Sequence, residues 1–173
     1  MKSTGVLRRI DELGRIVIPK EIRKNLKIKD GESLEIFIND DAVILKKYSY
    51  MSDLHDIAQN CSDSFYDVVK NDILITDLDK VIAASGSLKK KYLDKEISNN
   101  ISSMIKKRTT TIDDSKDIEI VNGTNEECNF IVSPVVSSGD AVGSVIILSD
   151  SNITDLIIKT SNFISKFLGK HLE

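Results

Sequence analysis

The first 50 residues carry more apolar side chains on short strands than so small a segment can bury alone. Two predicted strands, 5–10 and 15–18, precede a short helix, and a predicted hairpin follows at 33–38 and 42–47. The apolar strand positions are Ile16, Val17, Ile18, Leu34, Ile36, Ile38, Val43, Ile44 and Leu45. A segment of this size buries too little surface for stability of its own, and exposed strand edges pair readily with another chain. The sequence therefore predicts an obligate, intertwined dimer.

The predicted helix at 19–27 has two distinct faces. It begins at Pro19, which suits the first helical position because its missing N–H is not needed there. Ile22 and Leu26 stand four residues apart and are expected to point inward. The helical spacing places four cations along one outer side: Lys20, Arg23, Lys24 and Lys27. A row of this kind is often ordinary solvated surface, so on its own it is only a candidate binding site.

The overall formal charge of −3 conceals a basic first segment. Residues 1–29 hold 9 basic and 3 acidic residues, a net charge of +6. Residues 1–50 hold 11 and 8, a net charge of +3, whereas residues 51–173 hold 13 and 19, a net charge of −6. Such a split between two parts of a chain hints at nucleic-acid contact at the basic end. The charge pattern and the cationic helix therefore point to the same segment.

No constellation of catalytic or metal-binding residues assembles in the sequence. Cys61 and Cys128 have no close-spaced partner, and the two histidines, His55 and His171, are equally isolated. Neither a metal site nor nucleophilic catalysis by such residues is therefore indicated. Phosphate-binding glycine motifs are absent, and the acidic runs lack the ligand spacing of an EF-hand. We expect no catalysis, no metal and no cofactor.

Composition and hydropathy favour a cytoplasmic protein. With 40% hydrophobic and 29% charged residues, the chain has the composition of a soluble globular protein. No apolar run approaches the roughly 20 residues that span a bilayer. The N-terminal sequence MKSTGVLRRIDEL is too polar for a signal peptide. We therefore expect the protein in the cytoplasm.

The remaining chain is predicted to combine helices with antiparallel strands. Residues 52–70 are predicted to form a helix whose apolar stripe is Leu54, Ile57, Ala58, Cys61, Phe65 and Val68. Two interpretations of that stripe stay open: packing on its own domain, or a connecting helix that pairs with a neighbour. Strand patterns fill most of 71–150 around a helix at 95–108, with glycine-bearing turns between strands. The chain is predicted to end in a helix at 152–171.

Residues 2–48, KSTGVLRRIDELGRIVIPKEIRKNLKIKDGESLEIFINDDAVILKKY, resemble the AbrB-type DNA-binding domain of transition-state regulators. In that family a G-[IV]-[VL]-R-[RK]-[IV]-D-x-L-G-R-[IV]-V-I-P motif precedes an E-[IL]-R helix and an L-E-I hairpin, and all three parts are present here. The resemblance implies an N-terminal swapped-hairpin β-barrel formed by a dimer. This agrees with the dimer inferred from burial.

The resemblance also implies which residues contact DNA. Arg8, Arg15 and Arg23 match the DNA-contacting arginines of the family, and Lys24 stands where arginine is common. Lysine is a point charge where arginine can bind with two donors, so Lys24 is expected on a phosphate rather than a base. Arg9 and Lys2 are expected as further contacts. Three other motif residues are expected to serve the turns and the helix start: Asp11, Gly14 and Pro19.

Four further stretches extend the similarity over nearly the whole chain. KKYSYMSDLHDIAQ, ILITDLDKVIAASGSLKKKYLDKEIS, VNGTNEE and SPVVSSGDAVGSVIILS resemble the SpoVT family of sporulation regulators, in which a GAF-like domain follows the basic one. The resemblance implies an α+β chain with a DNA-binding and dimerisation domain at 1–50, a connecting helix at 51–70 and a GAF-like regulatory or oligomerisation domain at 71–173. The helices at 52–70 and 152–171 would join two dimers into a homotetramer.

The resemblance implies a sequence-specific regulator that binds double-stranded DNA at the nucleoid, activating some sporulation genes and repressing others. The GAF-like domain either binds a small-molecule effector or serves assembly alone, and no residue set identifies an effector. Two alternative functions remain: an antitoxin whose tail neutralises a toxin, and a small-molecule sensor whose first domain acts mainly as a dimeriser. Antitoxin tails tend to be short and disordered, whereas residues 71–173 have the patterns of a folded domain. The regulator is therefore favoured.

Overall fold

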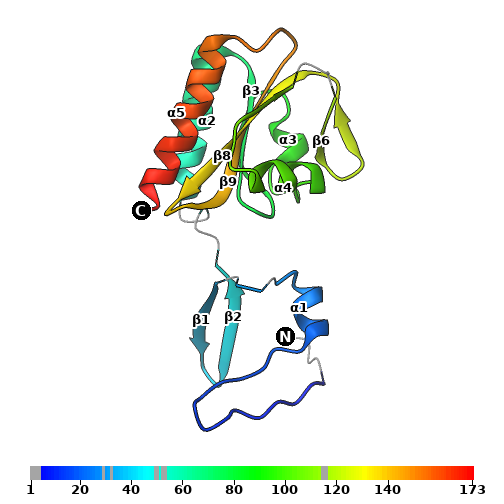
Figure 1. Ribbon diagram of the computed structural model, residues 1–173, viewed down its shortest axis with the longest axis vertical. Helices are drawn as coiled ribbons and strands as arrows, with labels where there is room; N and C mark the ends of the chain where they lie inside the picture. The colour runs from blue at the N-terminus through cyan, green and yellow to red at the C-terminus, as the bar shows by residue number, and fades with distance from the viewer. Residues whose placement is uncertain (1–4, 29, 32, 49–50, 52–53, 114–116) are drawn as a thin grey trace. The chain divides into compact units, whose positions relative to one another are not determined.

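The computed structural model describes residues 5–28, 30–31, 33–48, 51, 54–113 and 117–173 (Figure 1). By their contacts these residues separate into two compact units, Met1–Tyr48 and Ser49–Glu173. Each unit has its own secondary structure. No helix in the described parts of the chain is both long and apolar enough to cross a membrane.

The first unit contains one short helix and one hairpin. Helix α1 spans Lys20–Asn25, which is shorter than the predicted 19–27. Pro19 is its N-cap and not its first helical residue, because its ψ of 148° is extended. Strands β1, Leu34–Asn39, and β2, Ala42–Lys47, pair antiparallel around a two-residue turn, which confirms the predicted hairpin. The predicted strands at 5–10 and 15–18 do not form in the single chain. A strand needs a neighbouring strand for its backbone hydrogen bonds, and this chain by itself offers those segments none.

The first unit has no core of its own among its described residues. Every one of them is exposed or only half-buried. The cross-strand pair Ile38 and Val43 is 84% and 70% exposed, and Leu7 is 91% exposed. Apolar side chains left in water to this extent contribute little to stability. The unit therefore lacks the burial that an independent domain of its size requires.

The second unit is built on a five-stranded antiparallel sheet. Its strands are β3, Asp72–Thr76; β4, Val81–Ser85; β5, Thr111–Asp113; β8, Asn129–Ser137; and β9, Asp140–Ser149. Their order across the sheet is β4-β3-β9-β8-β5. A separate hairpin joins β6, Ile118–Val121, to β7, Thr124–Glu126, through the predicted Asn-Gly turn. The predicted meander is thus confirmed from β8 to β9.

Helices cover both faces of this sheet (Figure 1). Helix α2, His55–Val69, and helix α5, Asp155–His171, pack on one face, while α3, Lys89–Tyr92, and α4, Asn99–Lys106, lie with the β6–β7 hairpin on the other. Side chains alternate along β8, so that Ile131 enters the first core and Phe130 the second. Burial on both faces explains why the central strands carry consecutive apolar residues, Ile73–Leu74–Ile75 in β3 and Val145–Ile146–Ile147–Leu148 in β9.

In the second unit, α4 and β5 differ from the sequence prediction. Helix α4 begins at Asn99 rather than at residue 95, because the backbone before it bonds to the β3–β4 turn: the Ile97 N–H donates to the Asp79 carbonyl. Ser98 then caps the helix by accepting the Ile101 N–H. Strand β5 is three residues long and has no apolar alternation that would reveal it.

Helix α5 lies close against β8 because small residues form its inner side. Ser161 and Ser165 are buried there, and the Ser161 hydroxyl donates to the Ser133 oxygen at 2.8 Å. A Cβ atom placed on Gly169 would lie 2.2 Å from the Val136 carbonyl oxygen, well inside van der Waals contact. The glycine therefore sets how closely the helix approaches the strand.

Gly169→Ala is accordingly predicted to lower the free energy of unfolding by about 1–3 kcal/mol, since the added methyl group meets rigid backbone. Lys166→Ala, on the exposed side of the same helix, is the matched control and is expected within about 0.5 kcal/mol of the parent. Urea denaturation followed by circular dichroism measures both. Equal stability of the two variants would show that α5 does not pack as described.

Candidate nucleic-acid interface and helical groove

A tight turn at residues 11–15 fixes Arg15, one of the arginines predicted to contact DNA. The Gly14 N–H donates to the Asp11 carbonyl at 2.9 Å, and the Asp11 N–H donates to the Arg15 carbonyl at 3.1 Å. Gly14 has a φ of +75°, a conformation that glycine adopts without strain. The predicted role of Gly14 in the turn therefore has a geometric basis. The turn brings the Asp11 and Arg15 side chains together.

Asp11 uses both carboxylate oxygens within this turn. Its Oδ1 accepts the N–H groups of Leu13 and Arg15, at 3.0 and 2.8 Å. Its Oδ2 accepts from Arg15 Nε at 2.7 Å. The Arg15 backbone N–H, followed by the Arg15 side chain, holds the pKa of Asp11 below its ordinary value. Asp11 therefore stays ionised at neutral pH and keeps its hold on Arg15.

The Arg15 guanidinium keeps its outer edge available. Its side-chain contact within the described part of the chain is made by Nε alone, so Nη1 and Nη2 have no partner there. The Arg15 side chain is 71% exposed. Two parallel N–H donors are what a phosphate or the edge of a guanine accepts. The geometry leaves that pair of donors facing solvent.

Arg23, on α1, is held in a different way. Its Nη1 donates to the Asp30 Oδ1 at 2.7 Å, and its Nε is buried without a partner among the described residues. The side chain of Asp30 is 94% exposed and that of Arg23 is 39% exposed. One of the terminal nitrogens that could bind DNA is thus already occupied by a carboxylate.

The other predicted DNA contacts are less constrained. Arg8 and Arg9 are exposed on the segment before the turn, and Arg8 Nη1 donates to the adjacent Leu7 carbonyl at 2.9 Å. Lys24 is exposed in the last turn of α1, beside Arg23. Lys2 lies outside the described residues. The helix row predicted from the sequence ends early, because Lys27 lies beyond α1 in a left-handed conformation with a φ of +54°.

Two acidic residues join this surface, and for Asp11 the family resemblance implied only a role in the turn. Asp11 and Asp30 each bind one of the predicted DNA-contacting arginines. The four-residue spacing from Asp11 to Arg15 was a visible signal, but it belongs to a turn rather than to a helix. Asp30 is seven residues from Arg23, so only the folded chain reveals that pair.

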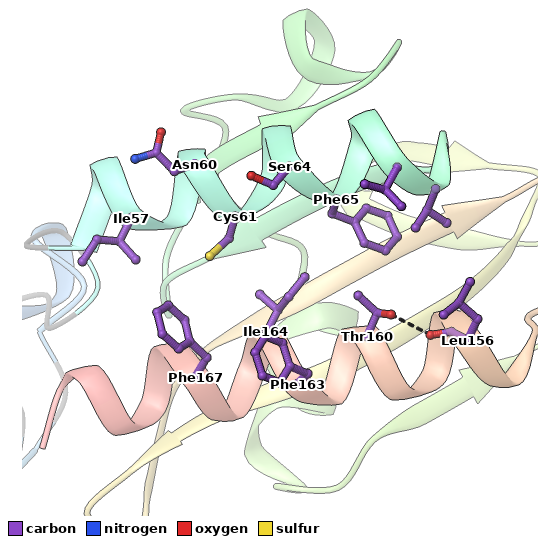
Figure 2. Close-up of a pocket in the computed structure, with 12 residues that line it drawn as sticks. Ile57, Asn60, Cys61, Ser64, Phe65, Leu156, Thr160, Phe163, Ile164 and Phe167 are labelled. Carbon is purple, nitrogen blue, oxygen red and sulfur yellow. Dashed lines mark hydrogen bonds between the residues drawn. The ribbon is translucent and has the colours of Figure 1, made fainter.

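An apolar groove of about 490 Å³ runs between α2 and α5 on the outside of the second unit (Figure 2). Ile57, Cys61 and Phe65 project into it from α2, and Phe163 and Phe167 from α5. The rings of Phe163 and Phe167 stack with centroids 6.2 Å apart, and these residues are 68% and 41% exposed. Burial raises the pKa of the Cys61 thiol. Cys61 therefore behaves as a small apolar side chain of the groove, as its place in the stripe predicts.

Some residues of the apolar stripe of helix α2 pack in the domain core, and others line the groove. Leu54, Ala58 and Phe65 are buried in the core against the sheet, which agrees with packing on its own domain. Val68 is 82% exposed and lies along the groove with Ile57 and Cys61. Part of the apolar stripe therefore stays exposed to solvent although the domain core is complete.

The described residues contain no group of three or more His, Cys, Asp or Glu side chains able to hold a metal ion. The buried thiol of Cys128 has its pKa raised to about 11, first by burial and then by neighbouring carboxylates including Glu126. A thiol with such a pKa is almost wholly protonated at neutral pH and is a poor nucleophile. Neither observation points to catalytic chemistry at these residues.

Comparison with known proteins matches both units. A family model described as Stage V sporulation protein T C-terminal, transcription factor, matches residues 53–173. A second, described as Antidote-toxin recognition MazE, bacterial antitoxin, matches residues 7–53. Stage V sporulation protein T of Bacillus subtilis (strain 168) is 44% identical over 177 residues, which cover 100% of this chain and 99% of that protein.

Shorter and more distant similarities agree with this division. The transition state regulatory protein AbrB of the same organism is 56% identical over 48 residues, covering 28% of this chain and 50% of that protein. The crystal structure of the GAF domain from Acinetobacter phosphoenolpyruvate-protein phosphotransferase covers 69% of this chain and 81% of that one, with a TM-score of 0.55 at 14% identity. At that identity only the fold is shared. The predicted combination of an AbrB-type and a GAF-like domain is confirmed.

Proposed function

This chain belongs to the stage V sporulation protein T family, and we propose on that premise that it regulates transcription by binding duplex DNA. The observation that carries the proposal is similarity of the whole chain to one sporulation protein, combined with similarity of its first part to a transition state regulator. The chain then acts in the cytoplasm, on the nucleoid, as a regulator and not as an enzyme. It activates some sporulation genes and represses others.

The proposed DNA-binding surface consists of Arg8, Arg9, Arg15, Arg23 and Lys24, together with Lys2. Its described members are exposed or half-buried, and they belong to the segment with a net charge of +6. Exposed guanidinium groups supply the charge that attracts phosphates and the paired donors that read guanine. The net charge of −6 on residues 51–173 does not oppose this, because at physiological salt a surface field decays over roughly 8 Å.

We propose that residues 1–50 bind DNA and dimerise, with a connecting helix at 51–70 and a regulatory and assembly domain at 71–173. The support for dimerisation is the absence of buried residues among the described residues of the first unit. A second copy would cover the exposed faces of the β1–β2 hairpin and supply strand partners for 5–10 and 15–18. Two-fold symmetry then doubles the cationic surface.

Salt dependence tests the DNA-binding surface. With roughly 6 to 8 phosphates neutralised per dimer, the logarithm of the binding constant is predicted to fall with that of the salt concentration at a slope of about −5 to −7. Arg15→Ala removes one contact from each protomer, so the slope should become shallower by roughly 2 and affinity should fall. Fluorescence anisotropy with a labelled duplex measures both quantities.

Arg108→Ala is the matched control, because it removes the same charge from the second unit, where Arg108 pairs with Asp140 at 3.2 Å. It should leave the slope unchanged. A parent slope near zero would remove the electrostatic basis of the proposal. Loss of the dimer in Arg15→Ala, detected by sedimentation, would make Arg15 a structural residue instead of a contact.

The proposed homotetramer forms through the predicted helices at 52–70 and 152–171, that is, through α2 and α5. The groove between them supports this, since its apolar side chains remain after both helices have packed on their own sheet. Exposed apolar surface of this kind marks interaction sites. The same groove on a second copy offers a complementary surface, so two dimers join by a symmetric contact.

Phe163→Glu is predicted to halve the mass of the protein in solution, because a carboxylate in the groove cannot be buried without a partner. Thiol labelling reports on the same surface. Cys61 should be protected in the parent tetramer and labelled in the variant, whereas Cys128, only 9% exposed, should stay unlabelled in both. The control is Lys166→Glu on the exposed side of α5. Unchanged mass and unchanged Cys61 labelling in Phe163→Glu would contradict the interface.

The fold of the second unit favours the transcription regulator over the alternative function of an antitoxin. The MazE match at 7–53 favours an antitoxin only for the DNA-binding part. Residues 53–173 match a transcription factor domain and fold into a sheet with two cores, unlike a short disordered tail. The sheet face beneath α3 and α4 is filled by Tyr92, Ile101 and Ile105, each at most 1% exposed. This close packing favours assembly as the main role of the domain, with regulation by a small effector as the second.

A further inference from the structure

Two arginines of the proposed DNA-binding surface are each held by a carboxylate, but through different nitrogen atoms. Asp11 binds Arg15 through Nε, at 2.7 Å. Asp30 binds Arg23 through the terminal Nη1, also at 2.7 Å. The distinction matters because the terminal nitrogens extend furthest from the protein. It decides which donors each arginine can offer to DNA.

We propose that Asp11 is a positioning residue for DNA recognition, which aims the Nη1 and Nη2 donors of Arg15 at a base edge or phosphate. The proposal rests on the proposed DNA-binding function. Its physical basis is the turn: two backbone N–H groups fix Oδ1, and the planar carboxylate then fixes Oδ2, which holds Nε. The guanidinium is planar, so holding one nitrogen at a fixed point restricts the direction of the other two.

Pre-orientation of this kind increases affinity without adding a contact. An arginine side chain that is free in solution loses rotamer freedom when it binds, and a side chain already held loses less. The advantage is greatest where two donors must align with two acceptors, as on the O6 and N7 atoms of guanine. A single phosphate oxygen accepts from many directions and benefits less. Asp11 should therefore affect specific binding more than non-specific binding.

Asp30 provides the opposite case within the same unit. It occupies the Nη1 donor of Arg23, so that DNA must displace it before Arg23 can bind through both terminal nitrogens. Its side chain is 94% exposed, which makes displacement easy but still places a negative charge on the surface that DNA approaches. Asp30 therefore competes with DNA, whereas Asp11 assists it.

Replacement by asparagine separates these roles from the structure of the turn. In Asp11→Asn the amide oxygen still accepts the N–H groups of Leu13 and Arg15, so the turn can persist. The amide nitrogen is a donor and cannot accept from Arg15 Nε, so the hold on the guanidinium is lost. Asp30→Asn makes the same chemical change beside Arg23. Both variants remove one negative charge from the surface.

Charge alone predicts that both variants bind DNA more tightly. The positioning role predicts opposite signs: Asp11→Asn should weaken binding to a specific duplex roughly tenfold, within the range for loss of a two-donor base contact, while Asp30→Asn should strengthen it. Non-specific binding should be unchanged or tighter in both. The probes are a duplex selected by this protein from a random pool and a scrambled duplex of equal composition, compared by fluorescence anisotropy at one salt concentration.

The double variant Asp11→Asn/Arg15→Ala shows whether Asp11 acts through Arg15. Its specific affinity should equal that of Arg15→Ala alone. A further loss in the double variant, or tighter specific binding by Asp11→Asn, would overturn the positioning role while leaving DNA binding intact. If Arg15→Ala itself binds both duplexes like the parent, the proposed DNA-binding surface fails instead, and the positioning role fails with it.

Arg15→Lys gives a second test that leaves Asp11 and its turn unaltered, should Asp11→Asn fail to fold. Lysine keeps the charge but lacks the separate Nε and Nη donors. Its salt slope should match the parent, with specific binding weakened roughly tenfold as in Asp11→Asn. Full specific affinity in Arg15→Lys would contradict the need for an oriented guanidinium.

Discussion

In the proposed dimer, burial of apolar side chains between two chains stabilises the first unit of this molecule. Its described residues include a helix and a paired hairpin, yet none of them is buried. The hydrophobic effect stabilises a fold only where apolar surface leaves water, and here it has not done so within one chain. Ile38 and Val43 lie opposite each other in the hairpin and remain largely exposed. In the proposed dimer a second copy covers this hairpin and supplies the missing burial, and the pairing brings two cationic surfaces into one body.

The second unit buries its apolar side chains within one chain. Its sheet is covered on both faces, so nearly all of its central strand residues are buried. The groove between α2 and α5 keeps several apolar side chains in water, among them Val68, Leu156 and Phe163. We thus propose two kinds of contact: the first unit completes its fold with a second copy, and the second unit, which has its own cores, keeps a surface for assembly. A regulator with both can hold several DNA-binding heads in one particle, which raises their effective concentration on DNA.

Local patterns were enough to predict most elements but not every pairing. The hairpin, α2 and α5 follow from alternation or helical periodicity, which a single chain displays in full. The strands at 5–10 and 15–18 have strand-like sequences, yet strand formation depends on a partner that this chain does not provide. Helix α4 begins late because the residues before it bond to a distant turn. Periodicity cannot reveal such a contact.

The candidate site was likewise predicted only in part from the sequence. Motif resemblance identified the arginines, because their positions are fixed along the chain. It did not identify Asp11 and Asp30 as their partners, because the partnership depends on which guanidinium nitrogen each carboxylate reaches.

The proposed core shared between two chains is tested most directly by isotope-filtered nuclear Overhauser measurements on a mixture of labelled and unlabelled full-length chains. We expect methyl contacts between Ile38 or Val43 of one chain and residues 5–18 of the other; methyl contacts confined to single chains would contradict an intertwined dimer.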